Sequence, residues 1–310
     1  MKKIGLLFPG QGSQYVGMGK DIYDRSPAAR EIFQEGNEAL GYDLTSLCFH
    51  GPEEDLKLTA NTQPAILTAS VAALRMMQAE REIVPLSAAG HSLGEYGALV
   101  AAGGLRFRDA VRIVHLRGKF MQEAVPVGVG AMAAIMGMSG PEVQVLCKEA
   151  AQGEILAPAN FNSPGQIAIS GHSTAVKRAV EIVAKQAGKK AVLLPVSAPF
   201  HCSLMQPAAE RLREALDQAE VGDFQFPVIS NVEADFYPGK ERIKDLLYRQ
   251  VEHPVRWEES MQKLISLGPA LVLEVGPGKV LSGLLRRISR DVPSANVEDG
   301  ATWEKVQGLL

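Results

Sequence analysis

Residues 90–94, Gly-His-Ser-Leu-Gly, have the types and spacing best suited to chemistry. A short apolar run, 83–89, precedes them, and a stretch typical of a helix, 95–102, follows them. A serine delivered by a strand to a helix start, between glycines, indicates a nucleophile elbow. Glycine lets the turn close without a Cβ, and N–H groups of the first helical turn can stabilise an oxyanion. The pattern predicts acyl transfer through an ester on Ser92; the alternative is a serine that only caps the helix.

A nucleophilic hydroxyl needs a base, and histidine is the usual one. The chain has six candidates: His50, His91, His115, His172, His201 and His253. We expect the side chain of His91 to point away from the neighbouring hydroxyl. His201 ends a proline-bearing segment, 197–201, at an expected domain junction, where side chains face a cleft more often than on a helix surface. His201 is therefore the candidate base, although a hydrogen-bonded structural histidine fits its position as well.

Arg117 is the third residue that could act on a substrate. It lies beside Val114, Gly118 and Met121, on the apolar side of an expected helix, 107–123. Arginine is rarely buried unless it is paired. One interpretation is a bidentate clamp on a substrate carboxylate, and the other is an internal salt bridge to a glutamate.

The elements that must position these residues alternate between strands and helices. Strands are expected at 2–8, 83–89, 227–230 and 271–275. Helices are expected at 18–40, 65–80, 95–102, 107–123, 204–219, 241–251 and 255–267, with Thr62-Gln63-Pro64 starting the second of them. This order predicts a discontinuous α/β domain made of residues 1–126 and 198–310.

Between these two parts the pattern changes. Strands are expected at 130–138, 155–161, 166–170 and 191–196, with helices at 140–152 and 173–188, the first opened by a capping box of Ser139 and Glu142. The order strand-helix-strand-strand-helix-strand is ferredoxin-like. Residues 127–197 are therefore expected to form a small inserted subdomain.

Composition limits the class of protein. The chain has 310 residues, 46% hydrophobic and 22% charged, with a net charge of −3. This excludes a nucleic-acid binder that acts through bulk positive charge. No apolar run reaches the roughly 18 residues of a membrane helix, and the first residues suit a strand better than a secretory signal. Three scattered cysteines fit a reducing cytosol and predict neither a disulfide framework nor a metal site.

Four segments, in this order, resemble the malonyl-CoA:acyl carrier protein transacylases and the acyltransferase domains of polyketide synthases. They are 8–14 (Phe-Pro-Gly-Gln-Gly-Ser-Gln), 62–65 (Thr-Gln-Pro-Ala), 90–95 (Gly-His-Ser-Leu-Gly-Glu) and 200–201 (Phe-His). Each segment alone is weak, but the ordered set is specific and covers nearly the whole chain. The resemblance implies an α/β fold, with a hydrolase-like parallel-sheet core and a ferredoxin-like insert.

The resemblance also implies residue roles. Ser92 matches the family's nucleophile and His201 its base. Gln11 and Leu93 match positions whose backbone N–H groups form the oxyanion hole. Arg117 matches the arginine that binds the free malonyl carboxylate.

Further matches surround these positions. Gln63 is expected to line the malonyl pocket. The backbone carbonyl of Gln250 is expected to orient the histidine, which makes the catalytic pair a dyad. Asn162 and Gln166 are expected to bind substrate where a turn borders its channel. Phe200 before the histidine resembles the malonyl-selective pattern of the family.

The implied activity is a two-step, ping-pong transfer of malonyl from CoA to the phosphopantetheine thiol of acyl carrier protein, supplying fatty acid synthesis. No permanently bound cofactor and no metal are implied. The expected partners are malonyl-CoA, CoA and the carrier protein, with no nucleic acid or membrane, and the expected form is a cytoplasmic monomer. Alternatives are a discrete acyltransferase of a polyketide pathway, a serine hydrolase, and a non-catalytic subunit that docks a carrier protein.

Overall fold

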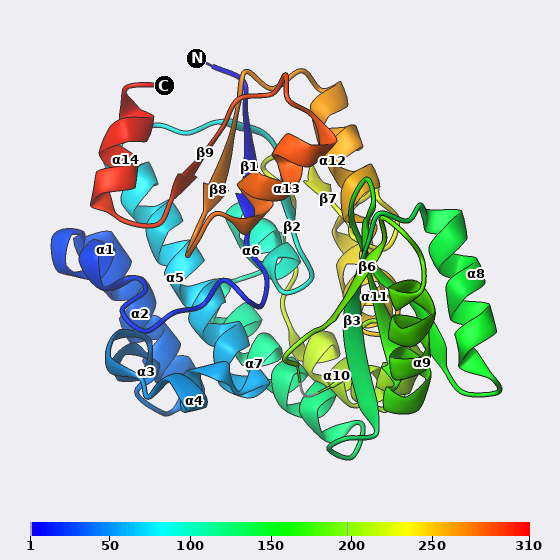
Figure 1. The fold of residues 1–310 in the computed structure, drawn as a ribbon. Helices are drawn as coiled ribbons and strands as arrows, with labels where there is room; N and C mark the ends of the chain where they lie inside the picture. The colour runs from blue at the N-terminus through cyan, green and yellow to red at the C-terminus, as the bar shows by residue number, and fades with distance from the viewer. Residues whose placement is uncertain (1, 197) are drawn as a thin grey trace.

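The protein, described here by a computed structural model covering residues 2–196 and 198–310, contains two β-sheets that lie side by side (Figure 1). The main sheet has five parallel strands in the order β7-β2-β1-β8-β9. These strands are β1 (Ile4–Phe8), β2 (Pro85–Gly90), β7 (Val228–Ile229), β8 (Leu271–Val275) and β9 (Ser294–Val297). Because the strands are parallel, their carboxyl ends meet at one edge of the sheet, where α/β proteins place their sites.

Helices pack around this sheet. The first half of the chain supplies α1 (Lys20–Arg25), α2 (Pro27–Leu40), α3 (Leu44–His50), α4 (Glu53–Lys57), α5 (Thr59–Glu80), α6 (Gly94–Ala101) and α7 (Phe107–Glu123). The second half supplies α10 (Gln206–Gln218), α11 (Ile243–Gln250), α12 (Trp257–Ser266), α13 (Val280–Ile288) and α14 (Gly300–Gln307), with short 3₁₀ turns at Ser203–Met205 and Lys240–Arg242.

The smaller sheet has four antiparallel strands in the order β4-β5-β3-β6. Its elements are β3 (Gly130–Met136), α8 (Gly140–Ala151), β4 (Leu156–Ser163), β5 (Gln166–His172), α9 (Ser173–Ala184) and β6 (Lys190–Leu193). The chain order and the strand order are both those of the predicted ferredoxin-like unit. The predicted capping box opens α8, since Ser139 and Glu142 bond each other's backbone.

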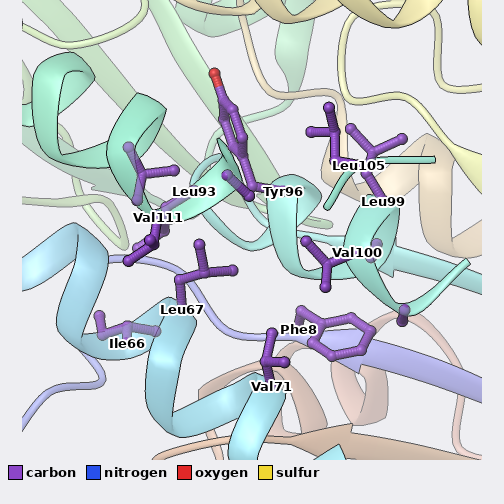
Figure 2. Packing of buried hydrophobic residues seen from close by; sticks show 14 of the residues in the cluster. Phe8, Ile66, Leu67, Val71, Leu93, Tyr96, Leu99, Val100, Leu105 and Val111 are labelled. Carbon is purple, nitrogen blue, oxygen red and sulfur yellow. The ribbon is translucent and has the colours of Figure 1, made fainter. Parts of the chain in front are cut away.

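Successive side chains of β1 pack alternately into apolar clusters on the two faces of the main sheet. Leu6 and Phe8 belong to the large cluster formed with α5, α6 and α7. Figure 2 shows part of this cluster, in which Phe8 lies next to Val71 and Val100. Leu7 faces the other way, into the cluster of α12 and α13. The strand carrying the glycine-rich loop is therefore fixed from both sides by apolar burial.

The start of α5 differs from the prediction. The helix begins at Thr59, so Pro64 lies inside it rather than in its first turn. Proline has no N–H to donate to the carbonyl four residues earlier, which belongs to Ala60. That carbonyl oxygen instead lies 2.9 Å from Nδ1 of His115 on α7. A side chain from a neighbouring helix thus replaces the bond that proline removes, and the helix continues past it.

Several other elements also differ from the predictions. The expected helix over 18–40 is two helices separated at Ser26, and α3, α4, β9, α13 and α14 were not predicted. These are short elements or elements near the chain end, which lack a long periodic pattern. No helix in the described part of the chain is long and apolar enough to cross a membrane.

The two sheets join through β4. The Phe161 N–H donates to the Val255 carbonyl at 2.9 Å, and the Val255 N–H donates to the Ala159 carbonyl at 2.9 Å. The segment before α12 therefore pairs with the smaller sheet and ties it to the main domain. The predicted boundaries of the insert stay predictions, and residue 197, at one of them, lies outside the described residues.

Candidate active site

Ser92 lies in a sharp turn between β2 and α6. Its φ of 52° is in the left-handed region, which a residue with a side chain rarely adopts. A Cβ on Gly90 would lie 1.9 Å from the Gly94 carbonyl, and a Cβ on Gly94 would lie 2.0 Å from the Phe8 oxygen. The absence of a Cβ on these two glycines therefore allows the backbone segments of the turn and of β1 to pack closely. The turn has the strained geometry of a nucleophile elbow, as the sequence predicts.

The side chain of His201 lies next to this serine. Its Nε2 lies 2.7 Å from the Ser92 Oγ. Its Nδ1 lies 2.9 Å from the Gln250 carbonyl oxygen and 3.2 Å from that of His253. Two carbonyl acceptors place the ring proton on Nδ1 and leave Nε2 free to accept from the serine. His201 also has a positive φ, 59°, so both members of the pair occupy strained backbone positions.

Burial, followed by the charge of Arg117, lowers the pKa of His201 to about 3. Only 3% of the residue is exposed. A histidine in this environment is neutral at physiological pH. The imidazole can therefore accept the serine proton, which is the first requirement for nucleophilic catalysis.

Arg117 reaches the same point from α7 and is 2% exposed. Its Nη2 donates to the Ser92 Oγ and to the Gln250 Oε1, both at 3.0 Å, and its Nη1 donates to the Gln63 Oε1 at 2.9 Å. None of the ion pairs among residues 2–196 and 198–310 includes Arg117, so the internal salt bridge considered above is not formed. Its Nε is buried without a hydrogen-bond acceptor among the described residues, so the donors of the guanidinium are not all satisfied within the chain.

A cavity of about 550 Å³ opens onto these groups. Its lining includes Gln11, Gln63, Ser92, Leu93, Arg117 and His201, six of the nine predicted site residues. Gln11 follows β1, Leu93 precedes α6, and neither backbone N–H donates to another described residue. Because β1 and β2 pair side by side, the two loops meet above the same strand ends. These N–H groups are in the region that an oxyanion hole requires.

Three predicted residues lie outside the cavity lining. Gln250 acts behind it, through the contacts to His201 and Arg117. The Asn162 Oδ1 lies 2.8 Å from the Nε2 of His91, so it contacts the elbow instead of the cavity. Gln166 accepts a hydrogen bond from Arg287 on α13. The substrate-binding roles of Asn162 and Gln166 therefore remain predictions without a supporting contact.

A buried polar group behind the elbow was not predicted. Glu95, in the first turn of α6, is 0% exposed and accepts from Tyr237, Gln250 and the Asn231 N–H. The Asn231 Oδ1 accepts from the Ser92 N–H at 2.7 Å, and its Nδ2 donates to the Gly90 carbonyl at 2.8 Å. One signal could have identified Asn231, because it follows an expected strand at the same sheet edge.

The fold and the site define an α/β enzyme with a serine–histidine pair at a nucleophile elbow and a buried guanidinium beside it. The chain belongs to the acyl transferase domain family, whose model matches residues 6–305.

Relatives share most of the sequence length. The chain is 51% identical over 305 residues to the malonyl CoA-acyl carrier protein transacylase of Bacillus subtilis (strain 168), covering 98% of this chain and 96% of that one. It is 49% identical over 288 residues to the protein of the same name from Escherichia coli (strain K12), covering 93% of each chain.

A solved malonyl-transacylase has the same fold. It was solved in complex with a type II PKS acyl-carrier protein and is 46% identical to this chain, with a TM-score of 0.96 over 99% of this chain and 100% of its own. The parallel sheet with its antiparallel subdomain is therefore the architecture of this family.

Proposed function

We propose that this acyltransferase moves the malonyl group from malonyl-CoA to the phosphopantetheine thiol of acyl carrier protein, supplying fatty acid synthesis. One observation carries the proposal: the Ser92 Oγ lies 2.7 Å from the His201 Nε2 and 3.0 Å from the Arg117 Nη2. The base and the cation therefore both lie within hydrogen-bond distance of the nucleophilic hydroxyl. An acyl group that carries its own carboxylate uses all three.

The first half-reaction loads the enzyme. The Ser92 Oγ attacks the thioester carbonyl carbon while its proton passes to the His201 Nε2. The oxyanion of the tetrahedral intermediate accepts from the Gln11 and Leu93 N–H groups, each worth on the order of 3 kcal/mol in such sites. The carbon–sulfur bond then breaks, and CoA leaves as a thiol with the proton that His201 held.

The second half-reaction reverses these steps with another thiol. The phosphopantetheine sulfur attacks the serine ester and gives its proton to His201. The oxyanion returns to the same N–H groups. The bond between carbon and the Ser92 Oγ breaks, and the oxygen regains a proton from His201. One thioester replaces another, so the transfer is close to thermoneutral and runs in both directions.

Arg117 links acyl selectivity to the strength of the base. Its guanidinium would pair with the free malonyl carboxylate, which an acetyl group lacks. Its positive charge also lowers the pKa of His201. A bound carboxylate offsets that charge, so the cognate acyl group makes the imidazole a better base at the moment of attack.

The remaining parts of the proposal concern partners and setting. The chemistry needs no resident cofactor or metal, because CoA arrives with the donor and phosphopantetheine with the acceptor. The three cysteines are free and buried, which supports a reducing, cytoplasmic setting. We expect the enzyme to act as a monomer.

Intact-mass measurement after mixing with malonyl-CoA tests the proposal. The wild-type protein should gain one malonyl group, and Ser92→Ala should gain none because it has no hydroxyl to acylate. Adding holo acyl carrier protein should then discharge the ester onto the carrier. Carrier proteins of fatty acid and polyketide systems, offered in parallel, distinguish the two pathways.

Three results would contradict the proposal. A malonyl adduct on Ser92→Ala would remove Ser92 from its role. Rapid release of free malonate without a thiol acceptor would indicate a serine hydrolase instead. A carrier protein that binds to the enzyme but receives no acyl group would indicate a non-catalytic docking subunit.

A further inference from the structure

The Arg117 guanidinium is buried among neutral acceptors. Its hydrogen bonds go to an amide of Gln63, an amide of Gln250 and the hydroxyl of Ser92. A buried cation without a carboxylate partner carries a large desolvation cost. Glu95 carries the nearby negative charge that interacts with it, although the two side chains do not touch directly.

The side-chain amide of Gln250 lies between the two charges. Its Oε1 accepts from the Arg117 Nη2 at 3.0 Å, and its Nε2 donates to the Glu95 Oε2 at 2.6 Å. The same Nε2 donates to the Ser92 carbonyl at 2.9 Å. If the amide were reversed, its NH₂ would face the guanidinium donors and its oxygen would face two acceptors. The observed orientation is therefore the one in which every contact is favourable.

Glu95 is the strongest constraint on that orientation, because both of its oxygens face hydrogen-bond donors even though burial raises its pKa to about 7. A carboxylate can only accept, so it requires the NH₂ end of the amide. Two further donors reach its oxygens, since Tyr237 donates to Oε1 and the Asn231 N–H donates to Oε2 at 3.1 Å. Glu95 lies in the first turn of α6, the helix that follows the nucleophile, and Gln250 ends α11, so the contact also fixes two elements relative to each other.

We propose that Glu95 is a positioning residue for acyl selectivity: it fixes the Gln250 amide, which in turn presents the Arg117 guanidinium to the substrate carboxylate. The inference rests on the proposed function and extends it by one residue. Glu95 touches neither the reacting atoms nor the cavity, because it is absent from the cavity lining. Its effect should therefore depend on whether the acyl group carries a carboxylate.

The test compares acylation by malonyl-CoA and by acetyl-CoA in three variants. Glu95→Gln keeps the shape of the side chain but can accept or donate, so the Gln250 amide loses its fixed orientation. We expect the malonyl KM to rise and the ratio of malonyl to acetyl kcat/KM to fall about tenfold. Gln250→Met keeps the carbonyl that orients His201 but removes the amide, and we expect the same fall. The double variant should fall no further than either single variant.

Tyr237→Phe is the matched control. It removes one donor to Glu95 on the side away from Gln250, leaves the carboxylate in place, and should keep the malonyl-to-acetyl ratio within about twofold of wild type. Thermal unfolding of each variant separates lost stability from lost selectivity. If Glu95→Gln does not fold, Gln250→Met alone decides.

The outcomes separate this inference from the proposed function. A wild-type protein that forms no malonyl ester would defeat the proposed function itself. A wild type that prefers malonyl, with a ratio unchanged or raised in Glu95→Gln or in Gln250→Met, would overturn only the role of Glu95. Equal losses for both acyl groups, or a Tyr237→Phe ratio that falls as far, would show that the network merely holds the elbow together.

Discussion

At the scale of single residues, Ser92 and His201 both have positive φ values, so both catalytic side chains are held on strained backbone. Such conformations cost of order 1–3 kcal/mol each and persist only where surrounding contacts enforce them. For the serine these contacts are the Asn231 side chain and the packed glycines, and for the histidine they are two carbonyl oxygens. The hydroxyl and the imidazole are therefore placed before substrate arrives.

Replacing Arg117 with alanine should remove acyl selectivity. A charge-assisted, bidentate contact is worth roughly 2–3 kcal/mol, so malonyl kcat/KM should fall about 100-fold while acetyl transfer changes much less. Arg117→Lys is the control, because it keeps the charge without the planar fork and should recover only part of the loss. Side-by-side steady-state assays measure both ratios. An unchanged malonyl preference in Arg117→Ala would exclude the clamp.

The lowered pKa of His201 predicts reactivity that survives mild acid. A base whose pKa falls to about 3 stays neutral at pH 5, whereas an imidazole of ordinary pKa would be only about 3% neutral there. Labelling of Ser92 by a neutral sulfonyl fluoride should therefore proceed at pH 5 within about threefold of its rate at pH 8. A neutral reagent avoids any titration of the acyl carboxylate. A fall of about thirtyfold would mean that His201 titrates normally.

At the scale of elements, the contact between α5 and α7 decides where the guanidinium lies. Gly118 follows Arg117 directly, and a Cβ there would lie 2.4 Å from the Thr59 carbonyl oxygen. The sequence suggests that Gly118 leaves room beside the arginine. The structure instead shows that it lets α7 approach the start of α5, which carries Gln63. The close approach of α7 to α5 therefore also determines where the Arg117 guanidinium lies.

Gly118→Ala should separate the two helices and lower both stability and malonyl transfer. Overpacking against backbone atoms costs about 1–3 kcal/mol in unfolding free energy. Gly283→Ala on α13 is the matched control, because a Cβ there meets nothing within 4 Å. It should stabilise the protein by roughly 0.5–1 kcal/mol, as alanine does in a helix interior. Denaturant unfolding of both variants measures the difference, and equal stabilities would contradict the close approach.

At the scale of the whole molecule, the crevice forms where the main domain meets the smaller sheet. Met132 and Asn160 line the cavity from the smaller sheet, and Leu194 follows that sheet, while Ser92 and Arg117 come from the main domain. The paired segment at Val255 keeps the two parts in register. A carrier protein that delivers its thiol to this cavity must therefore approach a surface built from both.

Carrier proteins are typically acidic, so exposed basic side chains on the docking face should assist docking, and the sequence offers the pairs Lys189-Lys190 and Arg286-Arg287 as candidates. Lys190 on β6 and Arg286 on α13 are exposed, whereas Lys189 already bonds Glu142. Charge reversal at Lys190 or Arg286 should raise the carrier KM about threefold, with the effect shrinking at high salt. Transfer to a small pantetheine thiol is the control and should not change. Equal effects on both acceptors would exclude these positions from docking.

The sequence by itself determined the nucleophile elbow, the order of the main elements and the ferredoxin-like insert. Each of these depends on local spacing: glycines around a serine, apolar periodicity and a capping box. The resemblance added the histidine and the arginine, for which residue types alone left alternatives open.

Only the tertiary structure decided which distant groups meet. The sequence could not show that Glu95, Asn231 and Tyr237 form one buried network, nor that His115 accommodates Pro64 in α5. The substrate contacts predicted for Asn162 and Gln166 stay predictions, and in the structure these side chains contact His91 and Arg287. Hydrogen bonds between residues far apart in the chain leave no periodic signal, because they are fixed by how whole elements pack.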